Sequence, residues 1–210
     1  MSDALSRSLT TDIGRYEKQR TLIPGVYVGF DPAELQDRSA LVVLGKDVPT
    51  IEIPEPKLKC RLMRDLSISG EGLKNVTYLE QARMLIKMDK KMYITKLMVD
   101  VTSHRAVFEF LQEYFGSRAE GITFTKPLKL EMINATRVAF QERMIEFDKS
   151  HLYYDVLRRE LYELHPEKLK HNDKGSDDFV WSLSMAIRAT SVLQYKSGVD
   201  SGESDEELIF

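Results

Sequence analysis

The sequence predicts an α/β fold in which a mixed sheet of five or more strands is flanked by helices. Three strand-like stretches come first, and the short connection between the first two favours an antiparallel hairpin. Helix-like and strand-like stretches then alternate, which is typical of parallel strands joined by helical crossovers. The patterned part of the chain closes with helices. At 210 residues, the chain is long enough for one domain with a buried core.

The predicted strands are apolar or alternating stretches separated by turn-forming residues. Pro24-Gly25 marks the start of the first strand, and a segment rich in proline and charge, 45–57, separates the second strand from the third. The third strand alternates polar and apolar residues, as a strand with one buried face does. The predicted strands are 26–30, 39–44, 59–67, 96–101 and 121–124, with a short extended piece at 144–147.

The predicted helices are bounded by recognisable start and stop residues. Thr77 and Glu80 have the spacing of a capping box. Gly116 fits the end of one helix, His165-Pro166 ends another, and Ser176 is placed to cap the last. The predicted helices are 77–91, 104–115, 127–143, 152–164 and 176–193.

Composition sets the broad class and the domain limits. Hydrophobic content of 42% and charged content of 30% are ordinary for a globular protein. The single cysteine, Cys60, excludes a disulfide framework and a cysteine-based zinc site within one chain. Because the sequence has neither a secretory signal nor a membrane-length apolar run, we expect an intracellular protein with no membrane association. The expected organisation is an N-terminal arm or linker at 1–22, one domain at 23–195, and an acidic, disordered tail at 196–210.

The net charge of −3 does not exclude a nucleic-acid partner. Five acids and no base lie between Asp200 and Phe210. Without them, the chain carries 30 basic and 28 acidic residues, and a nearly neutral body with basic patches can bind a phosphate backbone.

Three acidic positions are the candidates for chemistry. Asp31 closes the first apolar strand, Asp100 closes the fourth, and Asp177-Asp178 opens the last apolar helix. Each has a structural alternative: Asp31 as a turn residue before proline, Asp100 as a helix cap, and the pair as partners of the helix dipole. Together, however, they can converge at one edge of the sheet, where carboxylates repel one another unless a cation lies between them. Hard oxygen ligands of this kind suit Mg²⁺ or Mn²⁺, and two such ions side by side commonly cleave phosphodiesters.

With these acids in this strand order, the sequence resembles the RNase H-like nuclease domain of the large subunit of viral DNA-packaging terminases, of the phage type, over most of residues 26–193. Matching stretches are Asp31-Pro32-Ala33 with Asp37, Asp100-Val101-Thr102, Thr125 to Lys129, Arg159-Glu160-Leu161 and, most specifically, Asp177-Asp178 with the apolar helix after them. The chain departs from the family at Ser103-His104-Arg105, where many members carry glycines, and at Ser176, where many carry histidine.

The resemblance implies an RNase H-like fold and a two-metal endonuclease that cuts concatemeric viral DNA during genome packaging. In-line attack by a metal-bound water on the phosphodiester is expected. Asp31 would bridge two Mg²⁺ or Mn²⁺ ions, Asp100 would bind one, and Asp177 or Asp178 the other, with Asp37 assisting. Apart from the resemblance, basic clusters along the chain give Lys126, Lys129, Lys170 and Lys174 as candidates for contacts with DNA phosphates, the alternative being a solvated charged face.

The implied partners are double-stranded DNA, the terminase ATPase domain, the small terminase subunit and the portal, in the host cytoplasm if the protein is viral. The phosphate-loop string G-x-x-x-x-G-K-[ST] is absent from the chain, so an ATPase motor is not part of it. The chain is therefore either a nuclease domain excised from a larger protein or a free-standing relative. Other readings are an RNase H-like resolvase or other nuclease, an integrase-like nucleotidyl transferase, or a non-catalytic DNA-binding or assembly module with the same fold.

Overall fold

The computed structural model describes residues 25–33, 38–46, 57–68, 76–102, 104–164 and 177–190. The predicted arm at 1–22 and the predicted tail at 196–210 lie outside the described residues, so their boundaries stay predictions. Among the described helices, none is both long and apolar enough to cross a membrane.

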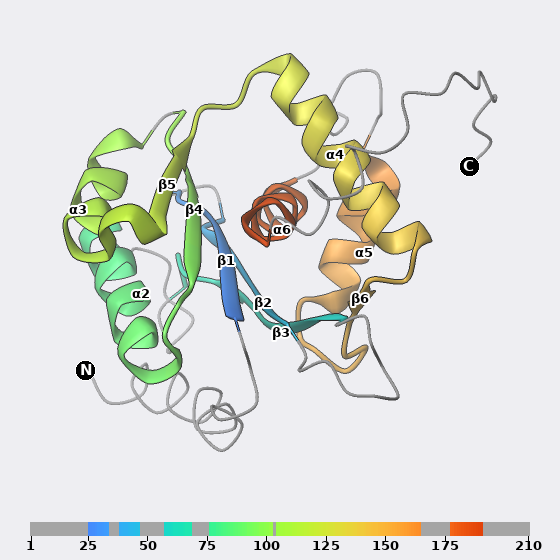
Figure 1. The fold of residues 1–210 in the computed structure, drawn as a ribbon, viewed down its shortest axis with the longest axis horizontal. Coiled ribbons are helices and arrows are strands. Elements are labelled where there is room, and N and C mark those ends of the chain that lie inside the picture. Colours follow the sequence, from blue (N-terminus) through green and yellow to red (C-terminus); the bar gives the residue numbers. More distant parts are fainter. Residues whose placement is uncertain are drawn as a thin grey trace.

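One six-stranded mixed sheet forms the centre of the fold, which confirms the predicted class (Figure 1). The strands lie in the order β5-β4-β1-β2-β3-β6, so β1 is an inner strand. Strands β1, β2 and β3 are antiparallel neighbours, whereas β4 runs parallel to β1, β5 parallel to β4, and β6 parallel to β3. The strands are β1 Gly25–Asp31, β2 Ala40–Lys46, β3 Leu58–Asp65, β4 Lys96–Asp100, β5 Ala119–Ile122 and β6 Ile145–Glu146.

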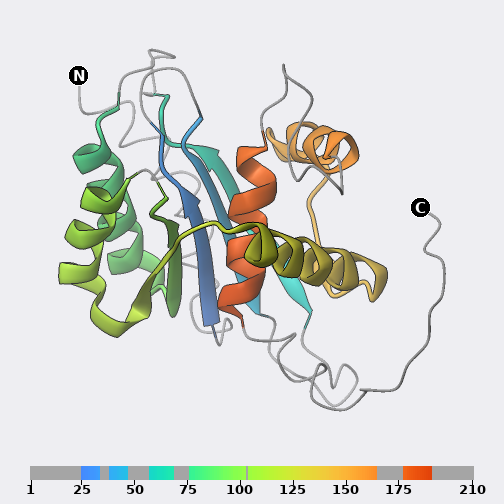
Figure 2. The same cartoon turned by 90° about the horizontal axis from the view of Figure 1, so that it is seen from above.

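Helices cover both faces of the sheet: α2 and α3 lie on one face, and α4, α5 and α6 lie on the other (Figures 1 and 2). The predicted capping box at the start of α2 is confirmed, since the Thr77 backbone N–H donates to the Glu80 carboxylate while the Glu80 N–H donates to the Thr77 hydroxyl. The helices are α2 Tyr78–Met92, α3 Arg105–Phe115, the short 3-10 helix η2 Gly116–Arg118, α4 Lys126–Gln141, α5 Tyr154–Glu163 and α6 Asp178–Ala189.

The sheet is buried on both faces, which explains its nearly continuous apolar strands. Successive side chains of a strand point to opposite faces, so each strand supplies two cores. On β2, Leu41 and Val43 pack in the core beneath α2 and α3, whereas Val42 and Leu44 pack beneath α5 and α6.

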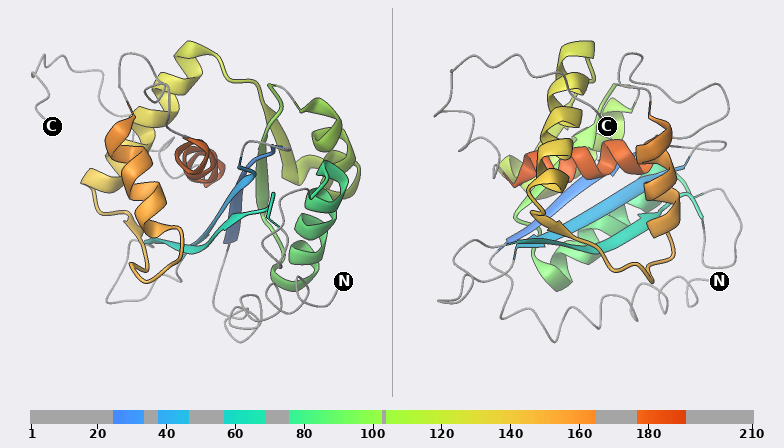
Figure 3. Two further views of the ribbon diagram at one scale, coloured as in Figure 1. Left: turned by 180° about the vertical axis from the view of Figure 1, so that it is seen from behind. Right: turned by 90° about the vertical axis from the view of Figure 1, so that its right-hand side faces the viewer.

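Helix α6 lies directly on the sheet, packed against β1, β2 and β4 (Figure 3). Its close approach requires glycine at position 29, because a Cβ atom there would lie 1.9 Å from the Ser182 carbonyl oxygen and 2.7 Å from the Ala186 nitrogen. The Ser182 hydroxyl donates a 2.9 Å hydrogen bond to the Ala40 carbonyl of β2. The position of α6 relative to the ends of the strands is thereby fixed.

The structure corrects the predicted limits of β5. The strand is Ala119–Ile122 rather than 121–124, because its parallel pairing with β4 runs from Leu97↔Ala119 to Asp100↔Ile122. Phe124 follows the strand, and its N–H donates to the Thr102 hydroxyl rather than to a strand neighbour.

Candidate metal centre

The four predicted acidic residues belong to elements that meet where strands β1 and β4 end. Asp31 is the last residue of β1 and Asp100 the last residue of its parallel neighbour β4. Asp177 and Asp178 begin helix α6, which packs on these two strands. Strands β1 and β4 therefore end side by side, and the helix that begins with Asp178 packs on both of them.

The pKa of the Asp31 carboxyl shows that these acids interact. It is raised well above its ordinary value, first by burial and then by the negative charges of Asp100, Asp178 and Asp177 in that order. Lys129 acts in the opposite direction. Asp31, Asp100, Asp177 and Asp178 are called the carboxylate cluster below, because the charges of the other three act on Asp31.

Asp100 is held in place by the residue two positions further on. One of its carboxylate oxygens, Oδ1, accepts from the Thr102 N–H at 2.8 Å and from the Thr102 hydroxyl at 2.5 Å. The same hydroxyl accepts from the Phe124 N–H at 3.0 Å, which ties the end of β4 to the segment after β5. These bonds fix one carboxylate oxygen of Asp100.

The N-terminus of α6 is capped by a residue from another helix. Ser176, the expected cap, lies outside the described residues, and the structure corrects the start of the helix: its N-cap is Asp177, whose side chain makes no capping hydrogen bond. Glu160 of α5 instead accepts from the Phe179 N–H at 2.9 Å and from the Val180 N–H at 3.2 Å. These are donors that the first turn of a helix leaves unpaired.

Arg38 completes this buried network. Its Nη1 donates to the Glu160 Oε1 at 2.8 Å, its Nε lies 3.8 Å from Asp65, and its guanidinium carbon lies 5.4 Å from the centre of the Phe179 ring. Glu160 is only 3% exposed. Its pKa is raised to about 7, chiefly by burial and then by the charge of Asp178, against the lowering effects of Arg38 and the two N–H groups.

Sequence reasoning did not assign a role to Glu160 or Arg38. Glu160 lies far from the acidic motifs along the chain, and Arg38, although it follows Asp37, shows no spacing that pairs it with Glu160. A cap donated by a separate helix leaves no local spacing signal. Glu160 lies in Arg159-Glu160-Leu161, a stretch that matches the terminase nuclease pattern, and this match is the signal in the sequence that could have identified it.

The predicted lysines differ in their placement. Lys129 is half-buried on α4, with its Nζ 4.3 Å from the centre of the Trp181 ring and 5.0 Å from that of Phe124, and its charge acts on Asp31. Lys126, the first residue of α4, is exposed and is not among the groups that shift the pKa of Asp31. Asp37, Lys170 and Lys174 lie outside the described residues.

The donor chemistry of the cluster fits a hard divalent cation. All four groups are carboxylates, and the negative charges of the other three disfavour ionisation of Asp31. A bound cation would offset this repulsion, and hard oxygen ligands suit Mg²⁺ or Mn²⁺. As they stand, the described residues contain no group of three or more Asp, Glu, His or Cys side chains placed to hold a metal ion.

Comparison with solved structures identifies the fold. The nuclease of the large terminase from the thermophilic phage G20c with bound magnesium is similar with a TM-score of 0.59 and 14% identity, covering 78% of this chain and 80% of that one. The human cytomegalovirus terminase nuclease domain, manganese-soaked and inhibitor-bound, has a TM-score of 0.52 and 10% identity, covering 89% and 96%. The nuclease domain of the bacteriophage SPP1 large terminase with bound manganese has a TM-score of 0.52 and 14% identity, covering 82% and 90%.

Comparison of sequences alone does not find this likeness. No protein-family model matches the chain, and no curated protein sequence matches it. The identities to the solved structures are low enough that the likeness rests on the arrangement of the backbone. By that arrangement, the chain has the RNase H-like fold of the nuclease domains of large terminases.

Proposed function

We propose that this protein is a metal-dependent DNA endonuclease that cuts concatemeric viral DNA during genome packaging, as a terminase large-subunit nuclease. The observation that supports the proposal is that the charges of Asp100, at the end of β4, and of Asp177 and Asp178, at the start of α6, act on Asp31 at the end of β1. The solved structures of the same fold add support, since they include terminase nucleases with bound magnesium and manganese.

The proposed metal ligands are the four clustered carboxylates. Asp31, at the centre, would share its oxygens between two Mg²⁺ or Mn²⁺ ions, with Asp100 holding one ion and the Asp177–Asp178 pair the other. Bound divalent ions supply a nucleophilic hydroxide at neutral pH and stabilise charge on the phosphate.

The remaining residues prepare the site for DNA. Thr102 fixes one oxygen of Asp100, which leaves the other oxygen to bind a cation. Lys129 is held against Trp181 and adds positive charge beside the carboxylates, where the DNA backbone would approach. Lys126, Lys170 and Lys174 are proposed as further phosphate contacts, and Asp37 as an accessory acid. Double-stranded DNA is the proposed substrate, with the terminase motor, small subunit and portal as partners.

Cleavage of supercoiled plasmid by the purified protein tests this function. We expect nicking or linearisation with Mn²⁺ or Mg²⁺, none with EDTA, and none for Asp31→Asn or Asp100→Ala with either metal. Asp155→Asn, an exposed acid on α5, is the matched control and should cut normally. An Asp31→Asn protein that cuts like the wild type contradicts the assignment. A folded wild type that cuts with neither metal favours the non-catalytic binding module.

A further inference from the structure

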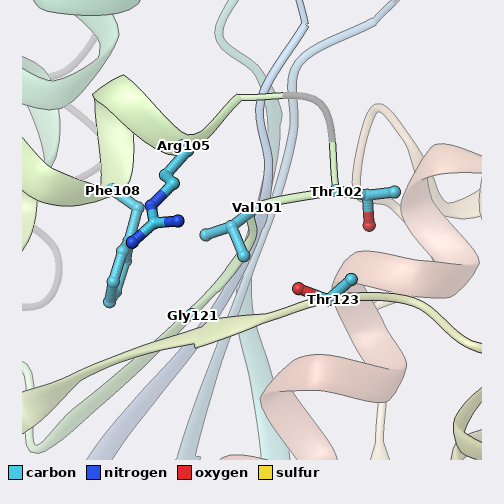
Figure 4. Close-up of a pocket in the computed structure, with 6 residues that line it drawn as sticks. All are labelled: Val101, Thr102, Arg105, Phe108, Gly121 and Thr123. Carbon is cyan, nitrogen blue, oxygen red and sulfur yellow. The ribbon is translucent and has the colours of Figure 1, made fainter.

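A pocket of about 460 Å³ lies at the ends of β4 and β5 (Figure 4). Two of its lining residues, Val101 and Thr102, directly follow Asp100 of the carboxylate cluster. Its walls come from three elements: the segment that follows Asp100, strand β5 with the residues after it, and the first turn of α3. The lining residues are Val101, Thr102, Arg105, Phe108, Gly121 and Thr123. The carboxyl ends of parallel strands are where open α/β sheets bind their ligands.

The lining residues combine one cation with hydroxyl and apolar groups. Arg105 and Phe108 lie on one side of the pocket, and the hydroxyls of Thr102 and Thr123 on the other (Figure 4). None of the residues that line the pocket is acidic. Such a lining suits an anion with an attached apolar part, and its volume falls in the range of small-ligand sites, roughly 300–1,000 Å³.

Arg105 is available to a ligand. Its side chain is 84% exposed, and its ion pair with Glu109, also exposed, joins Nε to a carboxylate oxygen at 3.1 Å. Exposed pairs of this kind are weak. Within the described part of the chain, Arg105 makes its hydrogen bond through Nε, so its two terminal nitrogens can form the planar fork that binds a phosphate.

The floor of the pocket depends on glycine at position 121. A Cβ atom there would come within 2.9 Å of the Val101 Cγ1 and 3.1 Å of the Phe108 ring. The absence of a side chain lets the Phe108 ring lie against the β5 backbone. The pocket wall is also joined to the cluster, because Thr102 lines the pocket while bonding Asp100 and Phe124.

We propose that this pocket binds one nucleotide of the DNA strand beside the phosphodiester to be cut. Arg105 holds its phosphate, and Phe108 and Val101 contact its sugar or base. The proposal rests on the proposed function, since the neighbouring carboxylates define where the phosphodiester lies. A nucleotide held there fixes the register of the strand over the cluster.

The test is the affinity of the protein for a short fluorescein-labelled DNA duplex, measured by anisotropy in Ca²⁺, together with plasmid cleavage kinetics in Mn²⁺. For Arg105→Ala, we expect Kd and KM to rise about tenfold while kcat stays within about twofold. The slope of log affinity against log salt concentration should become shallower by about one, because one phosphate contact is lost. Thr123→Trp, which fills the pocket while keeping Arg105, should weaken binding similarly. Lys149→Ala, an exposed lysine beyond β6 at the opposite edge of the sheet, is the control and should bind normally.

The outcomes separate this proposal from the proposed function. Unchanged Kd, KM and salt slope in Arg105→Ala overturn the pocket assignment while leaving cleavage intact. If the wild type binds DNA and does not cut it, and Arg105→Ala weakens binding, the nuclease assignment fails and the pocket stands as a nucleotide-binding site of a DNA-binding module. A wild type that neither binds nor cuts overturns both.

Discussion

Burial and the three neighbouring acids of the candidate site raise the pKa of the Asp31 carboxyl. Because its pKa in the folded chain lies above that in the unfolded chain, its contribution to stability is complete below about pH 4 and is lost as pH rises through the folded pKa. Once Asp31 is ionised, the repulsion within the cluster therefore destabilises the metal-free protein.

Asp31→Asn should consequently raise the melting temperature of the metal-free protein at pH 8 while abolishing cleavage. Each kcal/mol of relieved repulsion corresponds to about 2–4 °C in a protein of this size. Calorimetric melting in EDTA measures the shift, and it should shrink as the pH is lowered towards 4. A melting temperature lower than that of the wild type at pH 8 is inconsistent with repulsion at this residue.

Metal affinity should depend on pH for the same reason. Protons compete with the cation for Asp31, so Mn²⁺ affinity should rise as the pH is raised through the folded pKa, by up to about tenfold per pH unit for each proton released. Titration calorimetry across a pH series, in two buffers of different ionisation enthalpy, counts the protons. An affinity that does not change across the series, without proton release, contradicts the raised pKa.

At the scale of elements, the placement of Asp177 and Asp178 depends on how α6 is held. Glu160→Gln replaces one acceptor oxygen of the buried network by an amide donor, which then faces either Arg38 or the N–H groups of α6. We expect a loss of about 1–3 kcal/mol of unfolding free energy and slower cleavage, measured by denaturant titration and plasmid assay. Glu113→Gln, on the exposed face of α3, is the matched control. Unchanged stability in the Glu160 variant would show that the network does not hold the helix.

The contact between α6 and β1 is the second constraint on the helix. Gly29→Ala places a methyl group inside the backbone of α6, so we expect a loss of about 3 kcal/mol or more, or failure to fold. Gly116→Ala is the comparison for backbone strain alone: no atom lies within 4 Å of its added methyl group, but its φ of +59° strains alanine by about 1–3 kcal/mol. A Gly29→Ala protein as stable as the wild type would contradict close packing of α6 at Gly29.

For the whole molecule, the sequence predicted the features that local pattern determines. The mixed sheet, the antiparallel start and the capping box of α2 follow from periodicity, short connections and cap spacing. The ends of elements were less predictable where tertiary pairing sets them, as for β5, whose limits follow the register of β4.

The candidate site shows the same division between local and tertiary information. Asp31, Asp100, Asp177 and Asp178 stood out because each opens or closes an apolar element. The cap that Glu160 provides and the pocket beside Asp100 exist only after distant elements pack together, so no spacing in the sequence revealed them.

The most direct test of the central claim is a crystal structure of the protein soaked in Mn²⁺, with the ions located by anomalous scattering. We predict anomalous peaks at the end of β1, with Asp31 shared between two ions, Asp100 on one and the Asp177–Asp178 pair on the other. Anomalous peaks only elsewhere on the molecule, with none among these four carboxylates in a crystal that leaves them accessible to solvent, would contradict this assignment.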